Sequence, residues 1–129
     1  MKVNELRIGN WVNILGTECR IIEIDSIIES DQSVMVDRLI DGLNCSSDIS
    51  NVKGIPLTEE WLVRFGFEKE YFGGDIKLPW YSIKSIDYTF NLDYEFCYSR
   101  EDGGWIRLKH VHQLQNLYFA LTGEELTIK

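Results

Sequence analysis

The chain has 129 residues, of which 44% are hydrophobic and 26% are charged. This length matches one typical domain or two very small ones, and the composition predicts a soluble globular protein rather than a disordered or membrane-embedded one. The formal net charge is −8. Residues 1–57 carry five basic and nine acidic groups and residues 58–129 carry eight and twelve, so each part has a charge of −4. Such a chain repels phosphate backbones at long range, which argues against general nucleic-acid binding but allows a local basic patch.

The cysteines and the first residues bear on the compartment. Cys19, Cys45 and Cys97 are odd in number and far apart, and none belongs to a Cys-x-x-Cys pair. Secreted domains of this size usually carry even disulfide sets, so we expect three reduced thiols. The opening MKVNELRIGNWV lacks the apolar run of a signal peptide, and no segment approaches the roughly 20 apolar residues of a membrane-spanning helix. We therefore expect a cytoplasmic protein without membrane association.

The first part of the chain is rich in β-branched residues arranged in short runs. Residues 5–15, 18–25, 33–39 and 49–55 read as strands, with the turn-rich DGLNCSSD at 41–48 before the last of them. Four or five short strands joined by tight turns predict a small SH3-like β-barrel over residues 1–57. So small a barrel buries little apolar surface, so it would need additional packing against the rest of the chain to be stable.

A helix is predicted over residues 58–66. Thr58 can cap it, two glutamates occupy its first turn, and Gly66 can end it in the left-handed conformation. Its buried face would consist of Trp61, Leu62 and Phe65. We interpret this helix as a rigid connection, so the two parts should pack as one body.

The remaining residues predict an α+β unit over 58–129. Strands are expected within 67–109, and between Ile86 and Tyr98 the even positions are apolar while the odd ones are mostly polar. A three-residue hairpin loop near 91–93 would divide this run and keep its parity, leaving Cys97 on the outer face. A second helix is expected at 110–122. The fold class is thus an SH3-like barrel joined to a helix, an antiparallel sheet of three or four strands, and a helix.

Catalytic and metal-binding patterns are sparse. His110 and His112 could share a metal on a strand, but on a helix they are separated by about 200°. The sequence has no further histidine and its cysteines are scattered. No nucleophile has a base nearby in the sequence, and the glycine pairs lack the spacing of a phosphate-binding loop. We therefore expect no catalytic, cofactor-binding or metal residues, and no enzyme.

A short basic stretch, GWIRLKHVHQLQ, is the best candidate for binding nucleic acid or another anion. Trp105, Arg107 and Lys109 would share one strand face, with His110 beside them at the start of the helix. The alternative, which we favour, is that the two cations are only the polar face of an alternating strand.

The second predicted helix has two contrasting faces. Val111, Leu114, Leu117, Tyr118 and Leu121 would gather on the side that packs on the sheet. The opposite side is uncharged and carries four residues that we treat as a candidate partner face: His112, Gln115, Asn116 and Phe119. Amides with an aromatic ring can be desolvated and still hydrogen-bond, as at protein interfaces. Either the barrel covers this face, or a protein partner or second copy does.

Three blocks of the sequence carry a resemblance. NELRIGNWV at 4–12, IPLTEEWLVRFGFEK at 55–69 and VHQLQNLYFALTGEELTIK at 111–129 resemble blocks of a family of small uncharacterised proteins from phages, prophages and mobile elements of gut anaerobic bacteria. The resemblance implies no catalytic residue. It implies an accessory role in phage or mobile-element biology, and it fits our expectation of a non-enzymatic protein-interaction module. Nucleic-acid binding through residues 105–112 is the alternative function.

Overall fold

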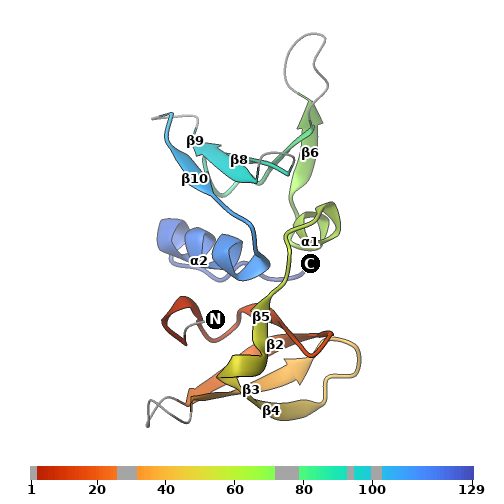
Figure 1. Cartoon of the computed structure of the whole chain (residues 1–129). Coiled ribbons are helices and arrows are strands. Elements are labelled where there is room, and N and C mark those ends of the chain that lie inside the picture. Colours follow the sequence, from red (N-terminus) through yellow and green to blue (C-terminus); the bar gives the residue numbers. More distant parts are fainter. Residues whose placement is uncertain (1–2, 26–31, 72–78, 93–94, 100–102) are drawn as a thin grey trace. The chain divides into compact units, whose positions relative to one another are not determined.

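The computed structural model describes residues 3–25, 32–71, 79–92, 95–99 and 103–129. Within them the chain is a mixed α+β protein of antiparallel sheets and two α-helices (Figure 1), which confirms the predicted α+β class. None of the described helices has the length and apolar character needed to cross a bilayer.

The backbone contacts divide the chain into two compact units, Met1–Ile55 and Pro56–Lys129. This division lies close to the boundary predicted between residues 57 and 58. The rigid packing of the two parts into one body stays a prediction, and each unit is described by itself.

The N-terminal unit contains one five-stranded sheet in the order β4-β3-β2-β1-β5. Its elements are η1 (Val3–Glu5), β1 (Trp11–Ile14), β2 (Thr17–Asp25), β3 (Ser33–Arg38), β4 (Asn44–Asp48), η2 (Ile49–Asn51) and β5 (Val52–Gly54). All neighbouring strands are antiparallel. No strand pair among the described residues closes this sheet into a barrel, so only the antiparallel sheet of the predicted barrel is observed.

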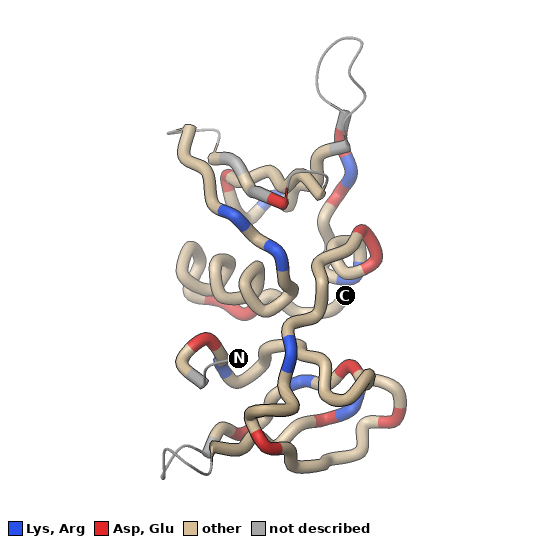
Figure 2. The backbone as a smooth tube through the Cα atoms, in the orientation of Figure 1, with Lys and Arg blue, Asp and Glu red and all other residues tan. Residues whose placement is uncertain are grey.

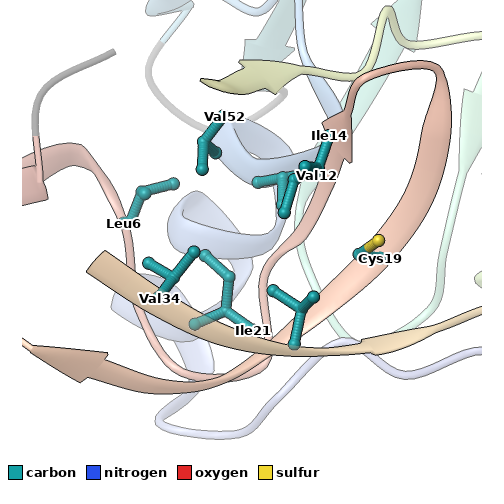
Figure 3. Packing of buried hydrophobic residues seen from close by; sticks show 8 residues of the cluster. Leu6, Val12, Ile14, Cys19, Ile21, Val34 and Val52 are labelled. Atoms are coloured by element: carbon teal, nitrogen blue, oxygen red, sulfur yellow. The ribbon is translucent and has the colours of Figure 1, made fainter. Parts of the chain in front are cut away.

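The core of this unit is made of small aliphatic side chains from every strand except β4, together with one leucine that follows η1 (Figure 3). Its buried members are Leu6, Val12, Ile14, Cys19, Ile21, Val34, Val36 and Val52. Alternate residues of β1, β2 and β3 supply most of them, because successive side chains of a strand point to opposite faces. No large aromatic ring belongs to this cluster, so the unit depends on close packing of many small contacts.

Strand β4 corrects the prediction of a turn-rich segment at 41–48. It pairs with β3 from Ser33↔Asp48 to Asp37↔Asn44, although Ser47 is its only residue that is not exposed. An edge strand held by backbone hydrogen bonds alone needs no apolar alternation. The sequence of β4 therefore lacks the apolar alternation by which a strand is predicted.

The C-terminal unit is a second five-stranded sheet, in the order β10-β9-β8-β7-β6, with a helix before and after it (Figure 1). Its elements are α1 (Glu59–Arg64), β6 (Glu68–Tyr71), β7 (Pro79–Ser82), β8 (Tyr88–Asn91), β9 (Phe96–Ser99), β10 (Trp105–Arg107) and α2 (Val111–Thr122). The predicted sheet of three or four strands is thus too small, because β7 was not among the predicted strands.

Helix α1 agrees closely with its prediction. The Thr58 hydroxyl accepts a hydrogen bond from the Trp61 N–H at 3.4 Å, and Gly66 has a φ of 91° just beyond the helix. Trp61, Leu62 and Phe65 are all buried, with Leu62 and Phe65 at 0% exposure. The capping residues and the apolar spacing therefore located this helix correctly.

The central strands correct the predicted alternation. Phe90 pairs with Cys97 across β8 and β9, so even positions of one strand face odd positions of the other. The parity changes because the connection runs from residue 92 to 95 instead of covering three residues. Cys97 is consequently buried, not outward. Thr89 and Asn91 are buried as well, so β8 is covered on both faces and alternation cannot identify its inner face.

Helix α2 begins one residue later than predicted, with His110 as its N-cap residue, and ends before Gly123, whose φ is 74°. The Gln113 side-chain oxygen accepts hydrogen bonds from the backbone N–H groups of Lys109 and His110, at 2.9 and 3.0 Å. These bonds satisfy donors that a helix start leaves unpaired, and they fix the end of the strand against the first turn of the helix.

We expect Ile21→Ala to lower the free energy of unfolding by about 2–5 kcal/mol, because it leaves a cavity among fully buried side chains. The matched control is Ile8→Ala, since Ile8 is 60% exposed and its truncation should change stability by less than about 0.5 kcal/mol. Urea unfolding followed by circular dichroism measures both. Equal effects of the two variants would contradict the described core.

Candidate functional site

The predicted partner face on α2 is only partly at the surface. His112 and Gln115 are buried, at 3% and 1% exposure, while Asn116 is half-buried and Phe119 is 39% exposed. The buried arc of α2 is therefore rotated from the one predicted, and Leu121, which was placed in it, is 45% exposed. An amide can be buried at little cost when it is hydrogen-bonded, so its presence on a helix does not by itself mark an interface.

The two histidines lie together in spite of their helical separation. The rings of His110 and His112 stack, with centroids 5.6 Å apart and an interplanar angle of 18°. This is possible because His110 has the extended conformation of an N-cap residue, so the helical angle does not apply to it. The described residues contain no group of three or more His, Cys, Asp or Glu side chains that could hold a metal ion.

The basic stretch lies at an edge of the second sheet. Trp105 and Arg107 share one face of the edge strand β10, and both are exposed, Trp105 to 66%. Lys109 follows the strand and is exposed, while His110 is half-buried. Figure 2 shows basic positions along the segment that leads from β10 into α2. The structure thus keeps the predicted aromatic and cationic residues near one another at the surface.

Two of the three thiols are poor nucleophiles. Burial raises the pKa of Cys97 to about 11, and burial together with the nearby Cys45 raises the pKa of Cys19. A thiol attacks as its thiolate, so burial lowers the reactive fraction of both groups at neutral pH. Cys45 is the exposed cysteine.

A surface that the sequence analysis missed lies at one end of the N-terminal sheet. Strands β1 and β2 are joined by the two-residue turn Leu15–Gly16, in which both residues have positive φ values, 51° and 88°. The Asn13 side chain accepts a hydrogen bond from the Gly16 N–H at 2.9 Å. Glycine, asparagine and aspartate favour such a turn, whereas leucine is strained in it. Leu15 is nevertheless 82% exposed.

The connection between β3 and β4 lies next to this turn. The Leu39 N–H donates to the Glu18 carbonyl at 2.9 Å, and Arg38 forms an ion pair with Asp41 at 3.2 Å within the connection. Ile40 is 82% exposed and Leu43 is 59% exposed.

Together these turns expose four large aliphatic side chains, which we call the hairpin-end patch: Leu15, Leu39, Ile40 and Leu43. A cavity of about 430 Å³ at the patch is lined by both turns, including Gly16, Glu18, Leu39 and Ile40. Turn segments are normally polar. The signal available in the sequence was therefore the presence of leucine and isoleucine inside NILGTE and RLIDGL.

No protein-family model, curated protein or solved structure matches the chain.

We expect the stability of the protein to fall as the pH rises from about 9 to about 11 through the ionisation of Cys97. The folded pKa is raised from 9.0 to about 11, so the unfolded chain loses this proton first, and the stabilisation that is complete below pH 9 is lost progressively between pH 9 and about 11. Urea midpoints at pH 8 and pH 10.5 measure the effect.

Cys97→Ala is the comparison for this pH effect, because lysines and tyrosines also titrate in the same range. The variant should lose less stability between the two pH values than the wild-type chain does.

In the native state at pH 8, iodoacetamide should alkylate Cys45 and spare the two buried thiols. Rapid alkylation of Cys97 in the native state would refute its burial.

Proposed function

We propose that the chain is a non-enzymatic protein-interaction module, and that its N-terminal unit has an SH3-like fold that binds a partner through the hairpin-end patch. The strand order β4-β3-β2-β1-β5 and the one-turn helix η2 before β5 support the SH3-like assignment. We propose this patch as the partner surface in place of the α2 face, because His112 and Gln115 of that face are buried.

The conformation of Leu15 carries this proposal. Holding a leucine at a φ of 51° costs on the order of 1 kcal/mol, and a side chain that is 82% exposed recovers almost none of that cost through packing. Beside it, Leu39, Ile40 and Leu43 also remain exposed, on a connection that is fixed by its own hydrogen bonds. A rigid group of exposed aliphatic side chains is characteristic of a protein contact surface.

Charge selects the kind of partner. The chain has a net charge of −8, so two copies repel each other, whereas a basic protein is attracted. Glu18 lines the patch cavity, and Asp41 lies in the adjoining turn. We therefore propose a partner that presents an apolar side chain within a basic surface. A cytoplasmic accessory role in phage or mobile-element biology, suggested by the resemblance of three sequence blocks, is part of the same proposal.

We expect Leu15→Asn to stabilise the chain and to abolish partner binding. Asparagine adopts positive φ more readily than leucine, so the free energy of unfolding should rise by about 0.5–1 kcal/mol. The variant removes an exposed apolar contact, so the partner recovered with the wild-type chain should be lost. Thermal unfolding measures the first effect, and quantitative affinity purification from native cells followed by mass spectrometry measures the second.

Ile40→Ser should abolish recovery of the same partner, while Ile8→Ser should preserve it. Ile8 is a matched control because it is 60% exposed and precedes β1, whereas Leu15 follows the other end of that strand. Partners retained by both patch variants would contradict the proposal. So would light scattering that shows a patch-dependent dimer, because a second copy would then occupy the surface.

A second candidate function is binding of single-stranded nucleic acid, and the exposed β10 edge favours it. Trp105 can stack on a base, and Arg107 and Lys109, which form no ion pair in the described part of the chain, can contact phosphates. The acidic charge of the whole chain opposes this function, so we rank it below protein binding.

If the second function holds, an unstructured oligonucleotide should be retarded by the protein in a low-salt gel, where phosphate contacts are strongest. Trp105→Ala should weaken binding by about 1–3 kcal/mol, the usual contribution of one stacked base. Arg107→Gln should weaken binding and also reduce its dependence on salt, and Lys53→Gln serves as the control. Absence of retardation of the wild-type protein would eliminate this function.

A further inference from the structure

A cavity of about 730 Å³ is lined wholly by residues of the C-terminal unit. Residues of β6, Gly66 and Lys129 line it together with Ser82 of β7 and the connection between β7 and β8. This volume is within the range of small-molecule sites, roughly 300–1,000 Å³. None of the functions proposed above uses this cavity.

Both sides of the cavity are held in place. The Ser85 hydroxyl, on the β7–β8 connection, is 2.8 Å from the hydroxyl of the buried Tyr118 on α2. On the other side, the Lys129 N–H donates to the Arg64 carbonyl at 2.8 Å. A Cβ atom at Gly66 would lie 2.9 Å from Cδ of Lys129, so the absence of a side chain there allows the lysine stem to pass.

The charged groups around the cavity are of both signs and do not pair with one another. The β7–β8 connection supplies Lys84 and Asp87, and the other side supplies Glu68, Glu70 and Lys129. Lys84, Asp87, Glu68 and Lys129 are exposed, and none of these four forms an ion pair within the described residues, although exposed pairs such as Arg20 with Asp37 do form. Two ammonium groups and three carboxylates therefore line one cavity, and both ammonium groups are open to a ligand.

We propose that this cavity binds a small zwitterion, an amino acid or a short peptide with free ends. The ligand carboxylate would pair with Lys84 or Lys129, and its ammonium group would pair with Glu68 or Asp87. A simple anion would leave the carboxylates unpaired, and a simple cation would leave the lysines unpaired. The hydroxyls of Ser82 and Tyr88, which also line the cavity, can hydrogen-bond to the peptide group or to either end.

The test is a nuclear magnetic resonance titration of the full chain with alanyl-alanine and with its N-acetylated, C-amidated and doubly capped forms. We expect saturable shifts of the amide signals of Gly66, Ser82 and Ser85 with the free dipeptide, and affinity at least tenfold weaker when either end is capped. Titration with alanine distinguishes a free amino acid from a short peptide as the ligand. An affinity for alanine comparable to that for alanyl-alanine assigns the cavity to free amino acids, and a much weaker affinity for alanine assigns it to peptides. Both results support the proposal.

Charge variants assign the two ends of the ligand. Lys84→Gln with Lys129→Gln should weaken binding of the free dipeptide about tenfold and leave the C-amidated form unaffected. Glu68→Gln with Asp87→Asn should do the same for the free dipeptide and spare the N-acetylated form. Lys53→Gln, in β5 of the other unit, is the control, and the spectra show whether each variant is folded. Absence of saturable shifts, or equal affinity for the doubly capped form, would overturn the proposal.

Discussion

The register between β1 and β2 is the constraint on which the N-terminal unit depends. Val12 pairs with Cys19, and the strands are closed by a turn of only two residues. A slip of one residue in either strand would turn that strand's core residues toward solvent, and the cluster of small aliphatic side chains has no large ring to compensate. The turn that fixes this register also holds Leu15 at the surface, so the stability of the sheet and the shape of the patch have one origin.

The sequence predicted the helices better than the sheets. Helix α1 was located by Thr58, its glutamates and Gly66, which are local signals that tertiary context did not override. Strands were harder to predict: β7 was not predicted at all, and two further strands of the described residues lack a usable pattern. The edge strand β4 is held by backbone pairing with β3, and β8 is buried on both faces, including Thr89 and Asn91. Alternation of apolar and polar residues identifies a strand only when one face of the sheet is buried and the other is exposed to solvent.

The candidate sites were predicted unevenly for a related reason. The exposure of Trp105, Arg107 and Lys109 could be predicted because charged side chains on an edge strand usually stay at the surface, while their binding role stays a prediction. The α2 face was misjudged in part, since uncharged amides are compatible with either a core or an interface, and Gln115 is in fact buried. The cavity between β6 and the β7–β8 connection could not be predicted, because it joins residues from segments far apart in the chain.

The hairpin-end patch and the cavity beside β6 differ in what they imply about folding. Leu15 is held at a positive φ and is exposed, so packing within the chain does not offset the cost of its conformation. A polar turn residue would serve the fold at least as well, which is why we propose that contact with a partner explains the leucine. The charges of the cavity, such as Lys84 and Asp87, are exposed and solvated and carry no comparable cost. They therefore bear on the chemistry of a ligand, and opposite charges along one cavity suit the dipolar ligand that we propose.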